Sequence, residues 1–196
     1  MPAEVALWFP NKALANLYGI VVLAALLSDQ LIPLLVGRKG RLTTSARDRG
    51  SFLLMYLAST LGLAAGLYFR YRNIGVAPLW MQALALPLLA IGTLLREWAI
   101  VLLGRFFSRT VTIEQDHRLI MGGPFRFVRH PAYTGMLLAD SSIILGLGTW
   151  AGALFMFIVM LFAALYRIHV EEQALLERFG DEYRAYMRNT GRLFPS

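Results

Sequence analysis

One stretch decides the fold class: residues 133–168 read YTGMLLADSSIILGLGTWAGALFMFIVMLFAALYRI. A single helix of this length would rise about 54 Å at 1.5 Å per residue, which exceeds a hydrocarbon core of about 30 Å. Gly146 and Gly148 interrupt the apolar run near its middle, where glycine allows the chain to turn. The stretch therefore predicts a tight helical hairpin that crosses a membrane twice, over residues 131–147 and 149–168.

Three earlier apolar segments, residues 17–36, 51–69 and 79–103, each reach the length of roughly 20 residues that a membrane helix needs. Over the whole chain 57% of residues are hydrophobic and 16% are charged, whereas soluble domains carry about 25% charged residues. We therefore expect an all-α polytopic membrane protein with five transmembrane helices and a C-terminal helix. Residues 1–196 are interpreted as one membrane-embedded domain, with no cleavable signal peptide.

The 19 Lys and Arg residues are unevenly distributed along the chain. Residues 37–50, 104–132 and 167–196 hold five each, and basic loops normally stay in the cytoplasm. This pattern predicts a multi-pass protein with its N-terminus outside and its C-terminus cytoplasmic. The net charge of +7 then reflects topology and contact with anionic lipid, and no nucleic-acid partner is predicted. The absence of cysteine excludes disulfides and cysteine-ligated metals, and no metal site is predicted.

Four ionisable residues stand out inside the predicted spans: Asp29, Arg96, Glu97 and Asp140. Counted from the span ends, they converge on one depth, about one third of the way in from the cytoplasmic side. Such residues are costly in lipid and usually pair with one another or face a wet cavity. Arg96 is therefore expected either to neutralise an acid and hold the bundle together or to line a polar cavity, and the two roles are compatible.

Residues 110–135 form a polar loop that enters the first arm of the hairpin at Pro131. Gly122 and Gly123 allow close backbone approach, and Arg129 and His130 stand at a helix N-terminus with free N–H groups. A histidine in this position is by itself more often a surface or capping residue than a ligand. The loop is nevertheless suited to wrap a polar ligand.

The string Arg-His-Pro-x-Tyr-x-Gly at residues 129–135, followed after the hairpin by Glu171 and Glu172, resembles the signature of the isoprenylcysteine carboxyl methyltransferase family. This family lies within the phospholipid methyltransferase superfamily. His117-x-Leu119 and the strings Phe-Gly-Asp-Glu-Tyr at 179–183 and Gly-Arg-Leu-Phe-Pro at 191–195 resemble the isoprenylcysteine branch. The similarity covers roughly residue 113 to the end of the chain.

The resemblance implies a methyltransferase that binds S-adenosylmethionine through residues 110–135 and 167–195. The residues that it places at the cofactor are His117, Leu119, Ile120, Gly123, Phe125, Arg129, His130, Tyr133 and Glu172. Phe125 departs from the pattern, because the family commonly has tyrosine there. An aromatic face is retained, but the hydroxyl group is absent.

Arg167 and Glu171 are spaced i, i+4 on the predicted fifth helix and share one face, whereas Glu172 is offset by about 100°. Without the resemblance, they would be interpreted as a surface ion pair. With it, the expected catalytic residues are Arg167 and Glu172, ahead of Glu171. The carboxylates would balance the positive charge of the cofactor, and a guanidinium suits a substrate carboxylate because it binds bidentately.

The first functional hypothesis is carboxyl O-methylation of a lipophilic, prenylcysteine-like acceptor at the cytoplasmic leaflet. A phospholipid N-methyltransferase, an NADPH-dependent membrane reductase of related architecture and a non-catalytic membrane scaffold remain as alternatives. The sequence gives no prediction for the oligomeric state.

Overall fold

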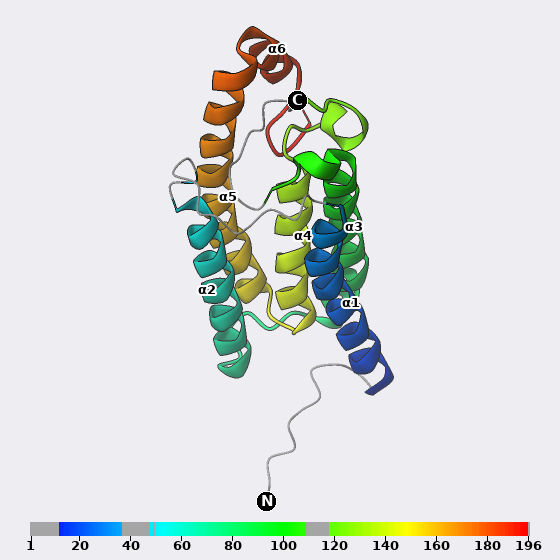
Figure 1. Ribbon diagram of the computed structural model, residues 1–196. Helices are drawn as coiled ribbons and strands as arrows, with labels where there is room; N and C mark the ends of the chain where they lie inside the picture. Colours follow the sequence, from blue (N-terminus) through cyan, green and yellow to red (C-terminus); the bar gives the residue numbers. More distant parts are fainter. Residues whose placement is uncertain (1–11, 37–47, 49, 109–117, 196) are drawn as a thin grey trace, which may run out of the picture.

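The computed structural model describes residues 12–36, 48, 50–108 and 118–195, without the side chains of residues 12–15. These ranges contain helices and no strand, which confirms the all-α prediction over the part described (Figure 1). The helices are α1 (Lys12–Val36), α2 (Ser51–Tyr71), α3 (Leu79–Leu103), α4 (Pro131–Gly146), α5 (Trp150–Phe179) and α6 (Asp181–Asn189), with short 3-10 turns η2 (Gly104–Phe106) and η3 (Gly123–Arg126).

Four helical segments are long and apolar enough to cross a membrane: Asn16–Leu35, Ser51–Tyr71, Leu79–Phe106 and Trp150–Phe179. They correspond to four of the five predicted spans. Helix α4 begins at Pro131 as predicted, but it has only 16 residues, a rise of about 24 Å. A full crossing by α4 therefore remains a prediction.

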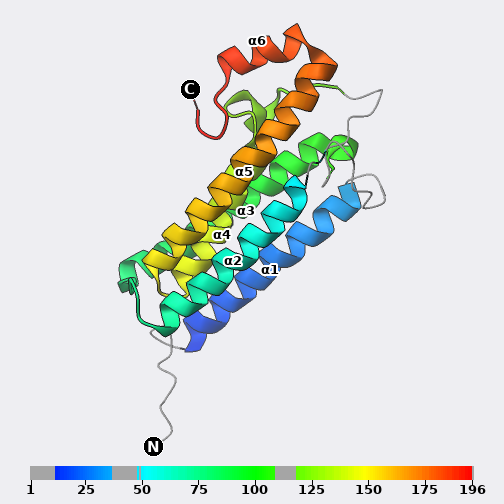
Figure 2. The same ribbon diagram turned by 90° about the vertical axis from the view of Figure 1, so that its left-hand side faces the viewer.

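The second arm of the hairpin continues beyond the predicted span, as the expected pairing of Arg167 with Glu171 on one helix requires. Helix α5 continues without interruption to Phe179, over 30 residues, or about 45 Å. In Figure 2 its C-terminal part extends beyond the ends of the neighbouring helices. The predicted span at residues 149–168 is thus about the first two thirds of one helix. Arg167 lies near the end of this part, and Glu171 and Glu172 lie on the C-terminal third.

Thr149 fixes the turn between α4 and α5. Its hydroxyl accepts the N–H of Gly152 at 3.1 Å and donates to the carbonyl of Ile74 at 2.8 Å. The N–H of Trp150 also donates to the carbonyl of Gly75 at 2.8 Å. These bonds tie the hairpin to the α2–α3 connection, so the two loops support each other at this end of the bundle.

Two helix pairs dominate the bundle: α3 packs against α4, and α2 packs against α5. Helices α3 and α4 approach most closely at Gly92 and Gly135, where a Cβ on Gly92 would lie 2.7 Å from the carbonyl oxygen of Gly135. Helix α1 packs on α3. In Figures 1 and 2, α1 and α2 lie along the same side of the α4–α5 hairpin.

The C-terminal segment returns to the loop that precedes α4. Gly180 separates α5 from α6 with a φ of 53°, a left-handed conformation that glycine adopts readily. After α6, the N–H of Arg129 donates to the carbonyl of Gly191 at 2.8 Å, and that of His130 donates to Arg192 at 3.1 Å. The end of the chain is thereby held against the residues that begin α4.

Candidate active site

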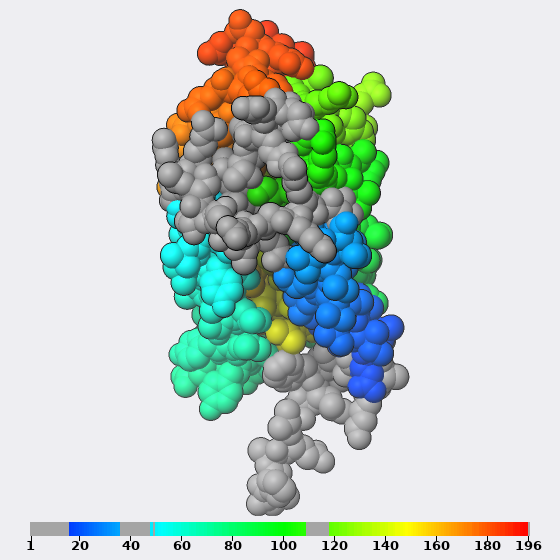
Figure 3. Space-filling model, viewed as in Figure 1, coloured from blue at the N-terminus to red at the C-terminus, as the bar shows by residue number. Residues whose placement is uncertain are grey.

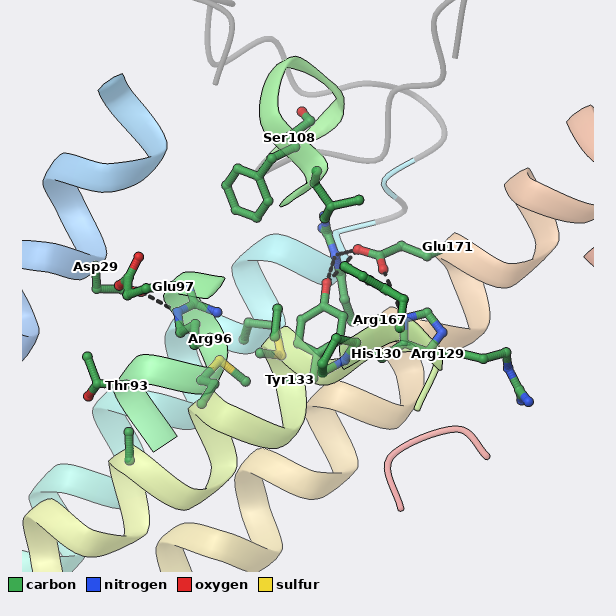
Figure 4. Close-up of a pocket in the computed structure, with 18 of the residues that line it drawn as sticks. Asp29, Thr93, Arg96, Glu97, Ser108, Arg129, His130, Tyr133, Arg167 and Glu171 are labelled. Carbon is green, nitrogen blue, oxygen red and sulfur yellow. Dashed lines mark hydrogen bonds and ion pairs between the residues drawn. The ribbon is translucent and has the colours of Figure 1, made fainter. Parts of the chain in front are cut away.

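A cavity of about 710 Å³ lies between the helices, with walls from α1 to α6 and from the loop before α4 (Figure 4). This volume is within the range of about 300–1,000 Å³ that small-molecule and cofactor sites occupy. Polar residues gather in two places on its wall. One group surrounds Tyr133, Arg167 and Glu171, and the other surrounds Arg96 and Glu97.

The structure brings most of the predicted site residues to this cavity. The predicted residues that line it are Leu119, Ile120, Phe125, Arg129, His130, Tyr133, Arg167 and Glu171. Gly123 and Glu172 are not among the lining residues. His117 lies outside the described residues.

Tyr133, Arg167 and Glu171 form a hydrogen-bonded triangle on the cavity wall. The hydroxyl of Tyr133 donates to Oε1 of Glu171 at 2.5 Å. Nε of Arg167 approaches both the Tyr133 oxygen at 3.1 Å and Oε1 of Glu171 at 3.0 Å. The i, i+4 pairing expected from the sequence is present, and Tyr133 from α4 completes it. Because each group holds the other two, the carboxylate and the guanidinium have fixed orientations.

Arg167 is also anchored from the opposite side by two residues that the sequence analysis did not identify. Its Nη1 donates to the carboxylate of Asp48 and to the hydroxyl of Ser51, the latter at 2.9 Å. Asp48 also accepts the N–H of Phe52 at 3.1 Å, at the start of α2. Asp48 and Ser51 lie 119 and 116 residues before Arg167 in the sequence. The one sequence feature that could have indicated them is that Asp48 is the single acid in the strongly basic segment 37–50.

Glu172 occupies a buried position behind the cavity and joins three cationic or ionisable groups. Its Oε1 accepts from Nε of Arg129 at 3.0 Å and lies 3.3 Å from Nε2 of His130. Its Oε2 accepts from Arg192 at 2.8 Å. Nη1 of Arg129 also donates to the carbonyls of Met187 and Thr190. Glu172 thus links α5, the loop before α4 and the C-terminal segment.

Two tyrosines of α6 close the cavity near Phe125. The hydroxyl of Tyr186 donates to the carbonyl of Phe125 at 2.5 Å, and burial raises the pKa of Tyr186 to about 12. Tyr183 is only 1% exposed and lines the cavity. Its hydroxyl has no hydrogen-bond partner within the described ranges, and burial raises its pKa, so it remains a neutral donor. Neither residue was among the site residues predicted from the sequence.

The four ionisable residues that the sequence places at one depth all line the second polar part of the cavity. Arg96 forms an ion pair with Asp29, which agrees with the expectation that Arg96 neutralises an acid within the bundle. Oε1 of Glu97 accepts from the hydroxyl of Ser28 at 3.3 Å. The Asp29–Arg96 pair therefore joins α1 to α3 and also faces the cavity.

A sequence profile of the isoprenylcysteine carboxyl methyltransferase family matches residues 74–177, more than half of the chain. The chain belongs to this family. The match contains α3, the loop before α4, α4 and most of α5, so it includes Arg96, the residues 129–135 string and both Glu171 and Glu172.

Two protein-S-isoprenylcysteine O-methyltransferases are each similar to about half of the chain. Protein-S-isoprenylcysteine O-methyltransferase of Schizosaccharomyces pombe is 34% identical over 109 residues, which cover 55% of this chain and 46% of that protein. Protein-S-isoprenylcysteine O-methyltransferase B of Arabidopsis thaliana is 30% identical over 109 residues, 55% of each chain. The chain therefore matches about half the length of these relatives.

A relative with a different name is methanethiol S-methyltransferase 1 of Bradyrhizobium diazoefficiens, which is 35% identical over 77 residues, 36% of this chain and 24% of that protein. Among solved structures, the eukaryotic intramembrane Ras methyltransferase ICMT superposes with a TM-score of 0.56 and 24% identity, covering 71% of this chain and 51% of that one. At this identity the superposition establishes the fold of the family for this chain and not its substrate.

Proposed function

We propose that this chain is an S-adenosylmethionine-dependent methyltransferase that methylates the carboxylate of a prenylcysteine-like acceptor from the cytoplasmic leaflet. The observation that carries the proposal is a single cavity with two kinds of wall. One part, around Tyr133 and Glu171, is polar and is bordered by Tyr183 and Tyr186 of α6. The other lies between the membrane helices and combines apolar side chains with the charges around Arg96. A hydrophilic cofactor and a lipophilic acceptor can meet in such a space.

The residues of the polar part fit the proposed cofactor. Tyr183 contributes a buried hydroxyl without a partner in the described residues, which is a position where a polar ligand would make a hydrogen bond. Glu171 provides a carboxylate for the ammonium of an amino acid, and Leu119, Ile120 and Phe125 provide an apolar wall for the adenosine. When bound, S-adenosylmethionine supplies a methyl group on a sulfonium, which is the electrophile.

Methyl transfer of this kind needs no protein nucleophile, so the residues act by alignment and by exclusion of water. Arg167 is the proposed receptor for the acceptor carboxylate, because a guanidinium N–H group forms a charge-assisted hydrogen bond with a carboxylate. Asp48, Ser51 and Tyr133 hold its plane fixed. We retain Glu171 and Glu172 as proposed catalytic residues with different tasks: Glu171 faces the ligands, and Glu172 positions Arg129 and His130.

A lateral opening between α1 and α2 would admit the lipophilic acceptor. Leu26 of α1 is 53% exposed, and Phe52 and Tyr56 of α2 are 41% and 65% exposed, although all three line the cavity. Figure 3 shows yellow atoms of the α4–α5 region in the gap between α1 and α2. Apolar side chains that face both lipid and cavity are what a membrane-side access route requires.

We also infer five membrane spans and a single domain, with the N-terminus outside and the C-terminus cytoplasmic. The positions of the basic segments support this orientation. Because the chain has no cysteine, single cysteines introduced at Asn73 and at Arg184 can be labelled without background. In intact cells or sealed vesicles, an impermeant thiol reagent should label the first site and not the second; the opposite pattern would reverse the orientation.

The decisive experiment is a tritiated methyl-transfer assay with purified protein in lipid and a panel of farnesylcysteine, geranylgeranylcysteine and phosphatidylethanolamine acceptors. The proposal expects base-labile label on the prenylcysteines and its loss in Arg167→Ala. Label on phosphatidylethanolamine alone would favour the phospholipid N-methyltransferase. Absence of saturable S-adenosylmethionine binding by calorimetry would exclude both methyltransferase hypotheses and leave a reductase, tested by NADPH binding, or a scaffold.

A further inference from the structure

The second polar part of the cavity contains more negative than positive charge. Three carboxylates line it, those of Asp29, Glu97 and Asp140, together with the guanidinium of Arg96. Arg96 is paired with Asp29 in a direct ion pair. Arg96 also interacts electrostatically with Glu97 and Asp140, so in this part of the cavity three carboxylates share one guanidinium among the described lining residues.

Glu97 presents an unsatisfied acceptor. The residue is 7% exposed and lies on α3, in the membrane-spanning part of the bundle. Its Oε1 accepts from Ser28, but its Oε2 is buried and has no hydrogen-bond partner in the described part of the chain. A buried carboxylate oxygen without a donor is strongly disfavoured in a low-dielectric environment. The cavity beside it is the place from which a donor could come.

Asp140 approaches the same space from α4. The close crossing at Gly92 and Gly135 brings the two helices together: a Cβ on Gly135 would lie 2.7 Å from the backbone nitrogen of Arg96. Asp140 is partly buried and makes no side-chain hydrogen bond with the described residues. Two acids on two helices thus line one cavity, and neither is used in the triangle around Arg167; Figure 4 shows Glu97 apart from that triangle.

The negative charge and the hydrogen-bond acceptors of these carboxylates favour one class of ligand. Ionised carboxylates only accept hydrogen bonds, whereas a primary ammonium carries three donors and a positive charge. A carboxylate ligand would be repelled, and an alcohol would offer one donor and no charge. The surrounding wall is apolar, with Leu89, Met136 and Ile143 among the lining residues. A primary ammonium on a long hydrocarbon chain satisfies both the acids and this wall.

We propose that Glu97 and Asp140 form a subsite for the primary ammonium group of a membrane-soluble amine. This proposal depends on the proposed function in one respect only, namely that the cavity admits a lipophilic molecule. The ammonium is held by charge-assisted hydrogen bonds and undergoes no reaction there. An amphiphilic amine bound in this way would occupy the path of the acceptor and compete with it.

The test measures equilibrium binding to the purified full chain in a nonionic detergent, without cofactor or methyl transfer. Four probes share a sixteen-carbon chain: hexadecylamine, hexadecanol, hexadecanoate and hexadecyltrimethylammonium. We expect hexadecylamine to bind at least about tenfold more tightly than hexadecanol, because hydrogen bonds to charged groups are worth about 1.5–3 kcal/mol. Hexadecanoate should bind more weakly than either. The trimethylammonium probe, which has the charge but no N–H donor, should lie between the amine and the alcohol.

Glu97→Gln should reduce the preference for hexadecylamine over hexadecanol to less than about threefold and leave the affinity for hexadecanol unchanged. Glu177→Gln is the matched control, because Glu177 is exposed and does not line the cavity; it should retain the wild-type preference. Asp140→Asn provides a second variant if Glu97→Gln does not fold.

Equal binding of hexadecylamine and hexadecanol by the wild type would overturn the proposal, and so would an unchanged preference in both cavity variants. The first result would mean that the acids are neutralised within the protein itself. The binding test measures no methyl transfer, so the two proposals can fail separately. A failed methylation assay would not contradict a measured preference for the ammonium probe. Absence of that preference would not contradict the proposed methyltransferase activity.

Discussion

The guanidinium of Arg167 in α5 hydrogen-bonds the carboxylate of Asp48, which lies 119 residues earlier in the chain. Both side chains are almost fully buried, at 4% and 2% exposure. Asp48 also begins α2 by accepting the N–H of Phe52. One carboxylate therefore fixes both the start of a membrane helix and the orientation of the arginine that we propose as the acceptor's receptor.

We expect Asp48→Asn to lower the free energy of unfolding by about 3 kcal/mol, because removing one partner of a buried ion pair leaves the other poorly compensated. Denaturant titration in detergent measures the change. Asp181→Asn is the control: its carboxylate pairs with Arg184 but is 94% exposed, so no measurable change is expected. Equal effects of the two substitutions would contradict a structural role for the buried pair.

Tyr133→Phe removes the hydroxyl that joins Arg167 and Glu171 at 3.1 and 2.5 Å. We expect kcat/KM for prenylcysteine methylation to fall by about tenfold to a hundredfold, since a lost hydrogen bond to charged groups is worth about 1.5–3 kcal/mol. Tyr71→Phe, at a position that is 81% exposed, should leave activity unchanged. Full activity in Tyr133→Phe would show that the triangle is dispensable for the reaction.

Tyr183 and Tyr186 should respond in opposite ways to loss of the hydroxyl. Tyr183→Phe removes a buried group without a partner in the described residues, so the protein without cofactor should be as stable as wild type or more stable by about 1 kcal/mol. S-adenosylmethionine binding, measured by calorimetry, should weaken by about fivefold to tenfold.

Tyr186→Phe should instead lower stability by about 1 kcal/mol, because it removes the bond to the carbonyl of Phe125. If Tyr183→Phe leaves the cofactor affinity unchanged, the Tyr183 hydroxyl does not contact the cofactor. The comparison separates a ligand-facing hydroxyl from one that holds α6 against the loop.

Gly92→Ala should destabilise the bundle by about 1–3 kcal/mol, the usual cost of overpacking. The new Cβ would lie 2.7 Å from backbone atoms of both Gly135 and Ala139, and backbone cannot move aside as a flexible side chain can. Gly19→Ala in α1 is the control, because no atom lies within 4 Å of a Cβ there. That substitution should stabilise the helix by about 0.5–1 kcal/mol, and thermal unfolding of both variants in detergent checks the difference.

Local patterns were sufficient to predict most of the helices. Apolar length predicted α2, α3 and the start of α4 at Pro131, and the glycines at residues 146 and 148 predicted the hairpin. These features depend on neighbouring residues, which is why the chain alone reveals them. Apolar length gave only the span at residues 149–168 and not the full 30 residues of α5, because the last turns of α5 leave the apolar stretch and are supported instead by contacts with the C-terminal segment.

The residues of the candidate site also divide into those that local sequence predicts and those whose placement depends on tertiary packing. The sequence by itself determined the string at residues 129–135, which is recognised by its resemblance to the family. It also determined the shared face of Arg167 and Glu171 and the common depth of the four intramembrane charges, since both follow from spacing along a helix. Only the tertiary structure decided which face of α5 looks into the cavity. It turns Glu171 toward the cavity and Glu172 toward Arg129 and Arg192, because the rotation of a helix is set by its packing against distant elements.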